Sequence, residues 1–344
     1  MQKFSDPSKT TAPSGAADGA ASSAARTAGA ARAELLMAGP LLPDLMARIE
    51  AKYRVHRWWE IDDRAGFLAR HGPAIRGIAT SGRHGATRDM ISSLPALEVI
   101  VSFGVGVDPI DMAGARQHGV VVANTPGVLD DCVADTALAL MLSVSRRICE
   151  LDRFVRAGRW RKESPPMGRK LGGRRCGILG LGNIGRQIAR RAEAFGMEIA
   201  YHNRSPRADA PAHYLYCADV HALARESDIL VLSLPGGGDT RKLVDQRVID
   251  ALGPQGILVN VSRGSVVDQD ALVLALREGR LAGAGLDVFE NEPDVPAALC
   301  AMEQVVLSPH IGSSTVETRQ AMAELVLANL DGWFEHRRVL TPVA

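Results

Sequence analysis

The feature that most constrains the fold is a glycine-rich segment between an apolar stretch and an amphipathic one. Residues 175–179 predict a short buried strand, and residues 184–195 predict a helix with one apolar face. Gly180, Gly182 and Gly185 have the spacing G-x-G-x-x-G at the junction. In a dinucleotide-binding turn these glycines permit a tight turn, the approach of a pyrophosphate, and close packing of helix on strand. The alternative is a merely structural turn. We expect a dinucleotide site, with free N–H groups of the helix start facing the phosphates.

A second apolar strand, at 197–202, completes the βαβ unit, and the residues after it bear on the choice of dinucleotide. An acidic residue about 20 positions past the glycines would hold the ribose 2′-OH of NAD(H), whereas an arginine accommodates the 2′-phosphate of NADP(H). Here the strand is followed by Asn203, Arg204 and Ser205, with no carboxylate. Arg204 can form a fork to a phosphate, and its neighbours can add hydrogen bonds. The sequence favours NADP(H), with NAD(H) possible, although Arg204 and Arg207 are also compatible with solvated loop charges.

The 344-residue chain has the composition of a soluble protein of two ordinary domains, with 46% hydrophobic and 23% charged residues. A formal net charge of +1 indicates no nucleic-acid or acidic-membrane partner, and no apolar run is long enough for a membrane span. The five cysteines are odd in number and scattered, so they match neither a disulfide framework nor zinc-ligand spacing. We therefore expect a cytoplasmic protein without a metal centre.

The order of apolar and helical segments predicts an α/β fold with two Rossmann-like or flavodoxin-like domains, each with a parallel sheet. Residues 1–32 are rich in Ala, Ser, Gly and Thr and are expected to form a disordered tail. We expect a dinucleotide-binding domain at 126–310, inserted into a substrate-binding domain made of 33–125 and 311–344. The predicted strands are 34–38, 53–59, 75–80, 97–103, 119–124, 175–179, 197–202, 228–234, 257–261, 284–288 and 304–307. The predicted helices between them include 43–52, 64–71, 88–93, 110–118, 219–225, 245–252 and 269–278, with long helical stretches at 130–158 and 314–334.

Three chemically active side chains follow strands of the second series, where open α/β sheets bind their ligands. They are Arg263, Glu292 and His310. Each alone has an ordinary explanation as a surface charge or a structural histidine, but together they suit the reduction of a 2-oxo acid by hydride. An imidazolium can protonate the developing alkoxide, and a neighbouring carboxylate favours the protonated ring. A guanidinium can bind the carbonyl and carboxylate oxygens of the substrate, and a nicotinamide would supply the hydride.

A further glycine-rich turn lies at 102–108 in the first domain, at the end of a predicted strand. The backbone N–H groups around Val105 and Gly106 could receive a substrate carboxylate. The alternative is an ordinary βα turn.

With these separated motifs the chain resembles the D-isomer-specific 2-hydroxyacid dehydrogenase family from about residue 33 to the C-terminus. The resemblance implies that His310 is the general acid, that Arg263 and Glu292 are catalytic, and that Val105, Gly106, Arg263 and His310 bind the substrate. It also implies that Asp287 faces the nicotinamide amide and that Leu234 and Pro235 line the adenosine pocket. The implied cofactor-binding residues are Gly180, Gly182, Asn183, Ile184, Gly185, Asn203, Arg204, Ser205, Leu234, Pro235, Thr240, Val261, Asp287, His310 and Gly312.

Within that family the chain is most similar to the NADPH-dependent glyoxylate/hydroxypyruvate reductases, at 131–135, 146–150, 203–205 and 340–343. This similarity implies a small 2-oxo acid substrate and a homodimer joined through the cofactor domain. Two alternatives stay open. One is an NAD-linked D-2-hydroxyacid dehydrogenase of a larger substrate. The other is a non-catalytic dinucleotide-sensing binding protein.

Overall fold

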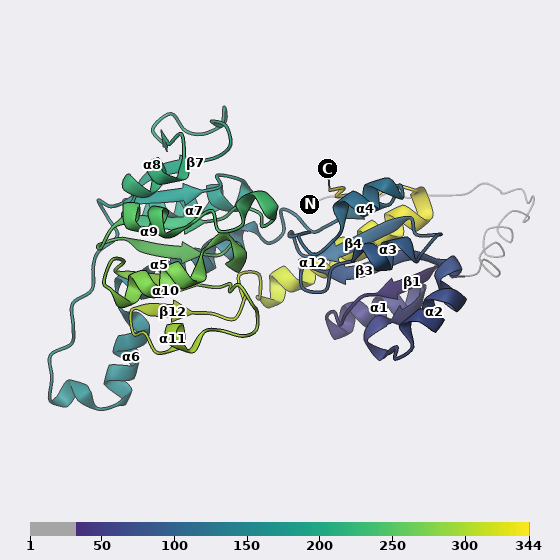
Figure 1. Cartoon of the computed structure of the whole chain (residues 1–344), viewed down its shortest axis with the longest axis horizontal. Helices are drawn as coiled ribbons and strands as arrows, with labels where there is room; N and C mark the ends of the chain where they lie inside the picture. Colours follow the sequence, from purple (N-terminus) through teal and green to yellow (C-terminus); the bar gives the residue numbers. More distant parts are fainter. Residues whose placement is uncertain (1–31, 344) are drawn as a thin grey trace, which may run out of the picture.

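The computed structural model describes residues 32–343, which form two parallel sheets covered by helices (Figure 1). The disordered tail predicted for residues 1–32 lies, apart from Arg32, outside the described residues. Within the described residues, the helices are too short or too polar to cross a membrane. The predicted α/β class with two parallel sheets is confirmed.

The first sheet has five parallel strands in the order β2-β1-β3-β4-β5, which is the flavodoxin-like order 2-1-3-4-5. Successive residues of β1 face opposite sides, so that Leu35 and Met37 lie in one apolar core and Leu36 in another. Helices on both faces cover these cores. The strands are β1 (Glu34–Met37), β2 (Arg54–Arg57), β3 (Ile75–Ser81), β4 (Val99–Phe103) and β5 (Val121–Ala123). The helices between them are α1 (Pro43–Lys52), α2 (Arg64–His71), α3 (Arg88–Ser92) and α4 (Met112–Gln117).

The second sheet has seven parallel strands in the order β12-β11-β10-β9-β6-β7-β8. Counted from β6, this is the Rossmann order 3-2-1-4-5-6 extended by one strand, and the strand order reverses between β6 and β9. Ligands of such sheets bind beyond the carboxyl ends of the strands at that reversal. The strands are β6 (Arg175–Leu179), β7 (Glu198–His202), β8 (Leu215–Tyr216), β9 (Ile229–Leu232), β10 (Ile257–Asn260), β11 (Gly283–Leu286) and β12 (Val305–Leu307). The helices that follow them are α7 (Asn183–Ala194), α8 (Val220–Arg225), α9 (Gln246–Leu252), α10 (Gln269–Arg277) and α11 (Ala297–Cys300).

The sequence-based boundaries needed a few corrections. The strand predicted at 53–59 ends at Arg57. Among the described strands β2 pairs with β1 alone, and β1 ends at Met37, opposite Arg57. The two-residue edge strand β8 and the four-residue helix α11 were not predicted, because neither is long enough to show a periodic pattern.

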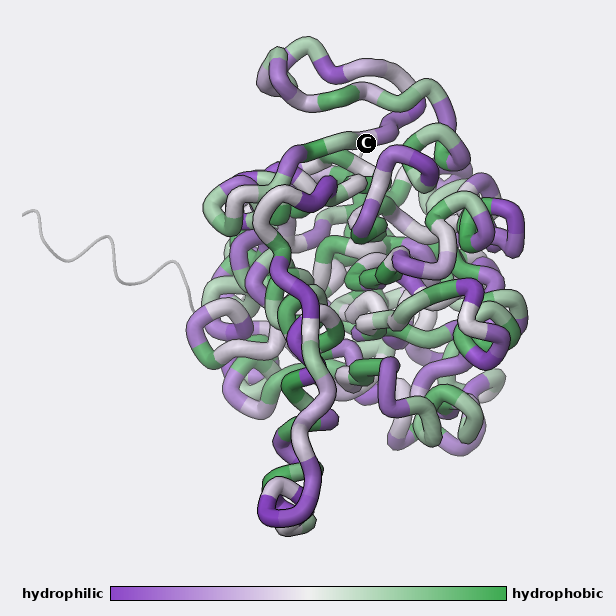
Figure 2. The backbone as a smooth tube through the Cα atoms, turned by 90° about the vertical axis from the view of Figure 1, so that its left-hand side faces the viewer, coloured by the Kyte–Doolittle hydropathy of each residue, from purple (hydrophilic) through white to green (hydrophobic). Residues whose placement is uncertain are grey.

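The helical stretch predicted at 130–158 is two helices, α5 (Asp130–Ser145) and α6 (Ile148–Arg156). They are separated at Arg147, whose φ of 55° is left-handed and stops the first helix. The segment 146–170, here called the arm, contains α6 and projects away from the second sheet in both views (Figure 1, Figure 2). It carries Trp160 and Met167, which are 66% and 93% exposed.

The last helix, α12 (Val316–His336), returns to the first sheet. Its apolar side, with Met322 and Leu330, is buried, and Tyr53 Oη donates a 2.7 Å hydrogen bond to Asp331. Beyond the helix, Val343 N–H donates to the carbonyl of Val122 in β5. The described part of the chain, residues 32–343, therefore passes through the first sheet twice, with the second sheet between the two passes.

Candidate active site

The glycine-rich turn after β6 has the geometry that each of its glycines predicts. Gly180 has a φ of 100°, which only glycine adopts without strain. A Cβ atom on Gly185 would lie 2.2 Å from the carbonyl oxygen of Gly180, so the close packing of α7 on the turn excludes any side chain. A Cβ on Gly182 would meet no atom within 4 Å. The backbone at Gly182 therefore faces open space at the N-terminus of α7, as a pyrophosphate site requires.

The segment after β7 is tied to this turn. Asn203 Oδ1 accepts a 2.6 Å hydrogen bond from Leu181 N–H, which places the end of β7 beside the glycines. Arg204 and Ser205 follow as exposed residues. Within residues 32–343, no ion pair engages Arg204.

One carboxylate does lie in this loop, at Asp209, but two guanidinium groups already bind it. Arg207 Nε is 2.7 Å from Asp209 Oδ1, and Arg186 Nη1 is 2.5 Å from Oδ2. The hydrogen bond from Arg207 contributes most to lowering the pKa of Asp209 to about 2. Asp209 is therefore charged and paired, whereas Arg204 remains available to an anion.

Other residues that the resemblance assigned to the cofactor lie at the same edge of the sheet. A Cβ atom on Gly180 would come within 3.0 Å of the Cβ atom of Leu234, which follows β9. Thr240 Oγ1 donates a 3.0 Å hydrogen bond to the carbonyl of Pro235 and holds the turn closed. Val261 follows β10 and is buried. Asn183 and Ile184 form the first turn of α7.

His310 and Glu292 form a direct pair. Nδ1 of His310 lies 2.8 Å from Oε2 of Glu292, and the other carboxylate oxygen accepts from Phe289 N–H at 3.0 Å. The His310 side chain is 49% exposed, so its free Nε2 edge is accessible. The residue also has a φ of 54°, a strained conformation for a histidine that is typical of functional sites.

The electrostatics of this pair keep the carboxylate charged. Burial alone would raise the pKa of Glu292. The hydrogen bond and charge of His310, the Phe289 amide and the charge of Arg263 outweigh burial and hold that pKa below its ordinary value. The arrangement can therefore present a proton on an imidazole that is oriented by a charged carboxylate.

Asp287 holds the loop that carries His310. Its buried carboxylate accepts hydrogen bonds from Ser308 Oγ at 2.6 Å, Ile311 N–H at 2.9 Å and Gly312 N–H at 2.8 Å. The resemblance implied a contact between Asp287 and the nicotinamide amide. In the structure the carboxylate is engaged chiefly in fixing residues 308–312.

Arg263 lies between the two sheets. Its Nε donates a 2.8 Å hydrogen bond to Asp108 of the turn after β4, and its Nη1 donates to the carbonyl of Ser262 at 2.6 Å. Asn260 orders the backbone beneath it, because its Nδ2 donates to the Arg263 carbonyl and its Oδ1 accepts from Ser262. A Cβ on Gly106 would lie 1.5 Å from Arg263 Nη2, so the guanidinium rests directly on that glycine. The structure thus brings the predicted substrate turn and Arg263 together.

The turn after β4 is braced from β5. Gly104 has a φ of 136° and its N–H donates to Thr125 Oγ1, while Asn124 Nδ2 donates to the carbonyl of Val105. Neither of these bonds uses the N–H group of Val105 or Gly106. The turn can therefore offer backbone donors to an anion.

Sequence reasoning missed the residues that hold the predicted ones in place. Asp108 stands within the predicted glycine-rich turn, but nothing in the sequence relates it to a residue 155 positions away. Asn260 and Ser308 each come directly after an apolar residue of a strand. A polar residue at the end of a strand was the only sequence feature that could have indicated their supporting role.

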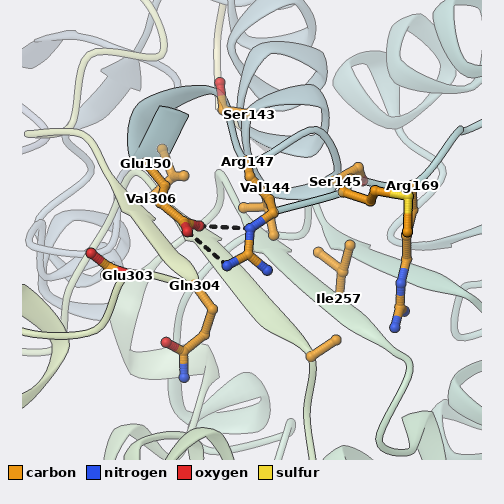
Figure 3. A pocket seen from close by; sticks show the side chains of 13 residues that line it. Ser143, Val144, Ser145, Arg147, Glu150, Arg169, Ile257, Glu303, Gln304 and Val306 are labelled. Atoms are coloured by element: carbon orange, nitrogen blue, oxygen red, sulfur yellow. Dashed lines mark hydrogen bonds and ion pairs between the residues drawn. The ribbon is translucent and has the colours of Figure 1, made fainter. Parts of the chain in front are cut away.

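A cavity of about 100 Å³ lies at the opposite edge of the second sheet and is not part of this site (Figure 3). Its wall includes Ile257, Ala282 and Gln304, which are at or before the starts of β10, β11 and β12. Arg147 and Glu150, at the base of the arm, form an ion pair beside it. The candidate site lies instead at the carboxyl ends of the strands.

Comparison with known proteins decides the family. The model for the NAD binding domain of D-isomer specific 2-hydroxyacid dehydrogenases matches residues 138–312. The chain belongs to this family. The resemblance drawn from the sequence is confirmed, and this 2-hydroxyacid dehydrogenase is an NAD(P)-dependent oxidoreductase.

Similar proteins extend the match over nearly all of the dehydrogenase chain. A hydroxyphenylpyruvate reductase of Plectranthus scutellarioides is 46% identical over 90% of this chain and 98% of its own. Glyoxylate/hydroxypyruvate reductase A of Arabidopsis thaliana is 45% identical with the same coverage. Among solved structures, an NADPH-dependent glyoxylate/hydroxypyruvate reductase of Sinorhizobium meliloti, in complex with NADP and malonate, is 43% identical. It covers 91% of this chain and 97% of its own, with a TM-score of 0.85. Similarity to reductases of 2-oxo acids thus spans both sheets.

Proposed function

We propose that this dehydrogenase reduces a short 2-oxo acid, glyoxylate or hydroxypyruvate first, to the 2-hydroxy acid with NADPH. The observation that carries the proposal is the 2.8 Å contact of His310 Nδ1 with the Glu292 carboxylate, on the same edge of the sheet as the glycine-rich turn. The reductases of glyoxylate and hydroxypyruvate among its relatives support this substrate class.

The proposed roles follow from the contacts. His310 holds a proton on Nε2 and gives it to the carbonyl oxygen as negative charge develops there, and Glu292 stabilises the imidazolium. Arg263 binds the substrate oxygens through Nη2, which lies against Gly106, and the amides of Val105 and Gly106 receive the substrate carboxylate. NADPH supplies a hydride when bound.

The residues present fit a phosphorylated dinucleotide. The open backbone at Gly182 and the start of α7 would hold the pyrophosphate, and Arg204 with Asn203 and Ser205 would hold the 2′-phosphate. The remaining proposed cofactor contacts are Gly180, Asn183, Ile184, Gly185, Leu234, Pro235, Thr240, Val261, Asp287, His310 and Gly312. The NADP complex of the S. meliloti reductase supports the preference for NADPH.

We also propose the domain division 33–125 with 311–344 for substrate and 126–310 for cofactor. The return of α12 to the first sheet and the packing of α5 on the second sheet support it.

A homodimer joined through the cofactor domain is supported by the exposed apolar residues of the arm, including Trp160 and Met167. Light scattering on the purified chain tests this assembly, and a monomeric mass would reject it. A cytoplasmic location remains a prediction.

The proposed activity is tested by the oxidation of NADPH, and separately of NADH, at saturating glyoxylate and hydroxypyruvate. Fast oxidation of NADPH with slow oxidation of NADH supports the whole proposal. Comparable rates would keep the reaction and reduce Arg204 to a surface charge, as an NAD-linked dehydrogenase requires. Cofactor binding without turnover on a wide set of 2-oxo acids would instead support the non-catalytic binding protein.

A further inference from the structure

Glu34, His56 and His71 form a cluster at the outer edge of the first sheet, away from the candidate active site. One ligand atom from each residue, a carboxylate oxygen or an imidazole nitrogen, lies within 4.8 Å of the other two. Glu34 begins β1, His56 lies in β2 and His71 ends α2. Because the three residues come from three elements with wide spacing, the sequence indicated no metal centre here.

The backbone holds these residues in place. In the parallel register of β1 and β2, Glu34 lies opposite Arg54 and Leu36 opposite His56, so Glu34 and His56 are diagonal neighbours on one face. Their side chains meet with Glu34 Oε2 2.7 Å from His56 Nε2. α2, whose start is capped by the Asp63 side chain, brings His71 onto the same face.

The surroundings are those of a partly desolvated site. The side chains of His56 and Glu34 are only 14% and 16% exposed. The ring of Phe67 packs on both histidine rings, at centroid distances of 5.1 Å and 4.9 Å, and the two histidine rings are 5.2 Å apart. Arg54, itself 62% exposed, donates to the other carboxylate oxygen of Glu34 at 3.1 Å. Arg54 thus orients one carboxylate oxygen of Glu34, while the other oxygen lies beside His56. Carboxylates that bind metals are commonly held by an outer hydrogen-bond partner of this kind.

We propose that Glu34, His56 and His71 bind a divalent transition-metal ion, Zn²⁺ first. Two imidazoles and one carboxylate are a ligand set that zinc takes up with water in the fourth position. In a tetrahedral site with bonds of about 2.0–2.1 Å, neighbouring ligand atoms are about 3.4 Å apart. The Glu34–His56 contact must open by about 0.7 Å to match that spacing. The bound ion would join β1, β2 and the end of α2 and so stabilise the edge of the first sheet.

The experiment uses the full chain without a histidine tag, stripped of metal with a chelator, and titrated with Zn²⁺ by calorimetry near neutral pH. The main variant is His71→Ala, which leaves the Glu34–His56 pair intact. Glu34→Gln is a second, isosteric variant. The matched control is His213→Ala, because His213 makes a similar 2.7 Å contact with Glu193 but meets no third metal-ligand side chain among residues 32–343. Circular dichroism and cofactor binding check that each variant is folded.

We expect wild type and His213→Ala each to bind one equivalent of Zn²⁺. His71→Ala and Glu34→Gln should bind Zn²⁺ on the order of 100-fold more weakly, because loss of even an outer-shell partner typically lowers metal affinity about 10- to 100-fold. Zn²⁺ should raise the melting temperature of wild type and the control but not of His71→Ala. Co²⁺ should give the visible absorption of a tetrahedral site in wild type and in His213→Ala, but not in His71→Ala. Equal affinity and stoichiometry in wild type, His71→Ala and Glu34→Gln would overturn the proposal and assign any binding to other groups.

Discussion

Arg263 Nε lies 2.8 Å from Asp108 Oδ2, and this contact joins the turn after β4 of the first sheet to the loop after β10 of the second. The two residues are 155 positions apart in the chain. Since Asp108 occupies Nε and the Ser262 carbonyl occupies Nη1, the guanidinium plane is fixed with Nη2 against Gly106. Asp108 therefore orients the cation that we propose for the substrate.

Removal of this contact should weaken substrate binding. In Asp108→Ala the KM for glyoxylate should rise about tenfold, because a charge-assisted hydrogen bond is worth about 1.5–3 kcal/mol, while kcat changes less. The control is Asp44→Ala, whose carboxylate is 83% exposed. A lower KM in Asp108→Ala would mean that Asp108 competes with the substrate for Arg263 and would reject the orienting role.

Substitution of Glu292 should change the pH dependence of turnover. The pKa of Glu292 is held below 4.5, so its carboxylate is charged at every pH above about 4.5 and is neutralised only as the pH falls through the lower, folded-state value. Any stability that this carboxylate contributes is present above about pH 4.5 and lost below it. In Glu292→Gln, kcat/KM should fall about tenfold or more at neutral pH. Because an amide does not titrate, any change in kcat/KM that protonation of the Glu292 carboxylate causes below about pH 4.5 should be absent in Glu292→Gln.

The matched control for that variant is Glu290→Gln, which removes a carboxylate of the same loop that pairs with Arg241. The pH profiles of kcat/KM for wild type and Glu290→Gln should coincide. If Glu292→Gln also gives that profile, Glu292 has no part in the proton transfer.

Arg204 should determine the preference for NADPH. In Arg204→Ala the kcat/KM for NADPH should fall about 10- to 100-fold, because a charge-assisted contact to phosphate is lost. The value for NADH, which has no 2′-phosphate, should change about twofold or less. Arg70→Ala, an exposed arginine on α2, serves as the control. Equal losses for the two cofactors would reject the proposed 2′-phosphate contact.

Glu98 should stabilise the attachment of α12 to the first sheet. Its carboxylate accepts hydrogen bonds from Arg337, Arg76 and the Trp333 indole. Burial raises the pKa of Glu98, but these donors outweigh it and lower that pKa to about 2. Because the folded-state pKa is below the unfolded value of about 4.3, the stabilisation is present above about pH 4.3 and is lost as the pH falls towards 2.

Glu98→Gln should therefore lose about 1–2 kcal/mol of stability at neutral pH, after allowance for the partly exposed arginines. Thermal melting should show a drop of a few degrees at neutral pH that shrinks at about pH 3. Glu335→Gln, which removes a mostly exposed carboxylate of α12, is the control. A difference between wild type and Glu98→Gln that stays constant with pH would contradict the assignment.

The sequence predicted the parallel sheets and the glycine-rich turn well, because both depend on local patterns. Leu179 ends a buried apolar run, and Gly180 and Gly185 have conformations or contacts that only glycine tolerates. The break between α5 and α6 at Arg147 could not be predicted, because the sequence contains no glycine or asparagine there to indicate a left-handed residue.

The candidate site was predicted residue by residue, but its internal contacts were not. Strand ends indicated Arg263, Glu292 and His310 separately. Their partners are contacts between distant residues, such as Asp108 with Arg263, or between loops, such as Ser308 with Asp287. The first bond depends on the packing of the two sheets and the second on the packing of neighbouring loops, and local sequence patterns determine neither.

The most direct test of the proposed proton transfer is the turnover of His310→Ala with NADPH and hydroxypyruvate, measured together with cofactor binding by protein fluorescence. His213→Ala, which removes another histidine paired with a glutamate, is the control. We expect kcat to fall about 10²- to 10⁴-fold in His310→Ala, while the Kd for NADPH rises far less, because His310 is only one of many proposed cofactor contacts. Near-normal turnover in His310→Ala would contradict the proposed proton transfer and, with it, the mechanism.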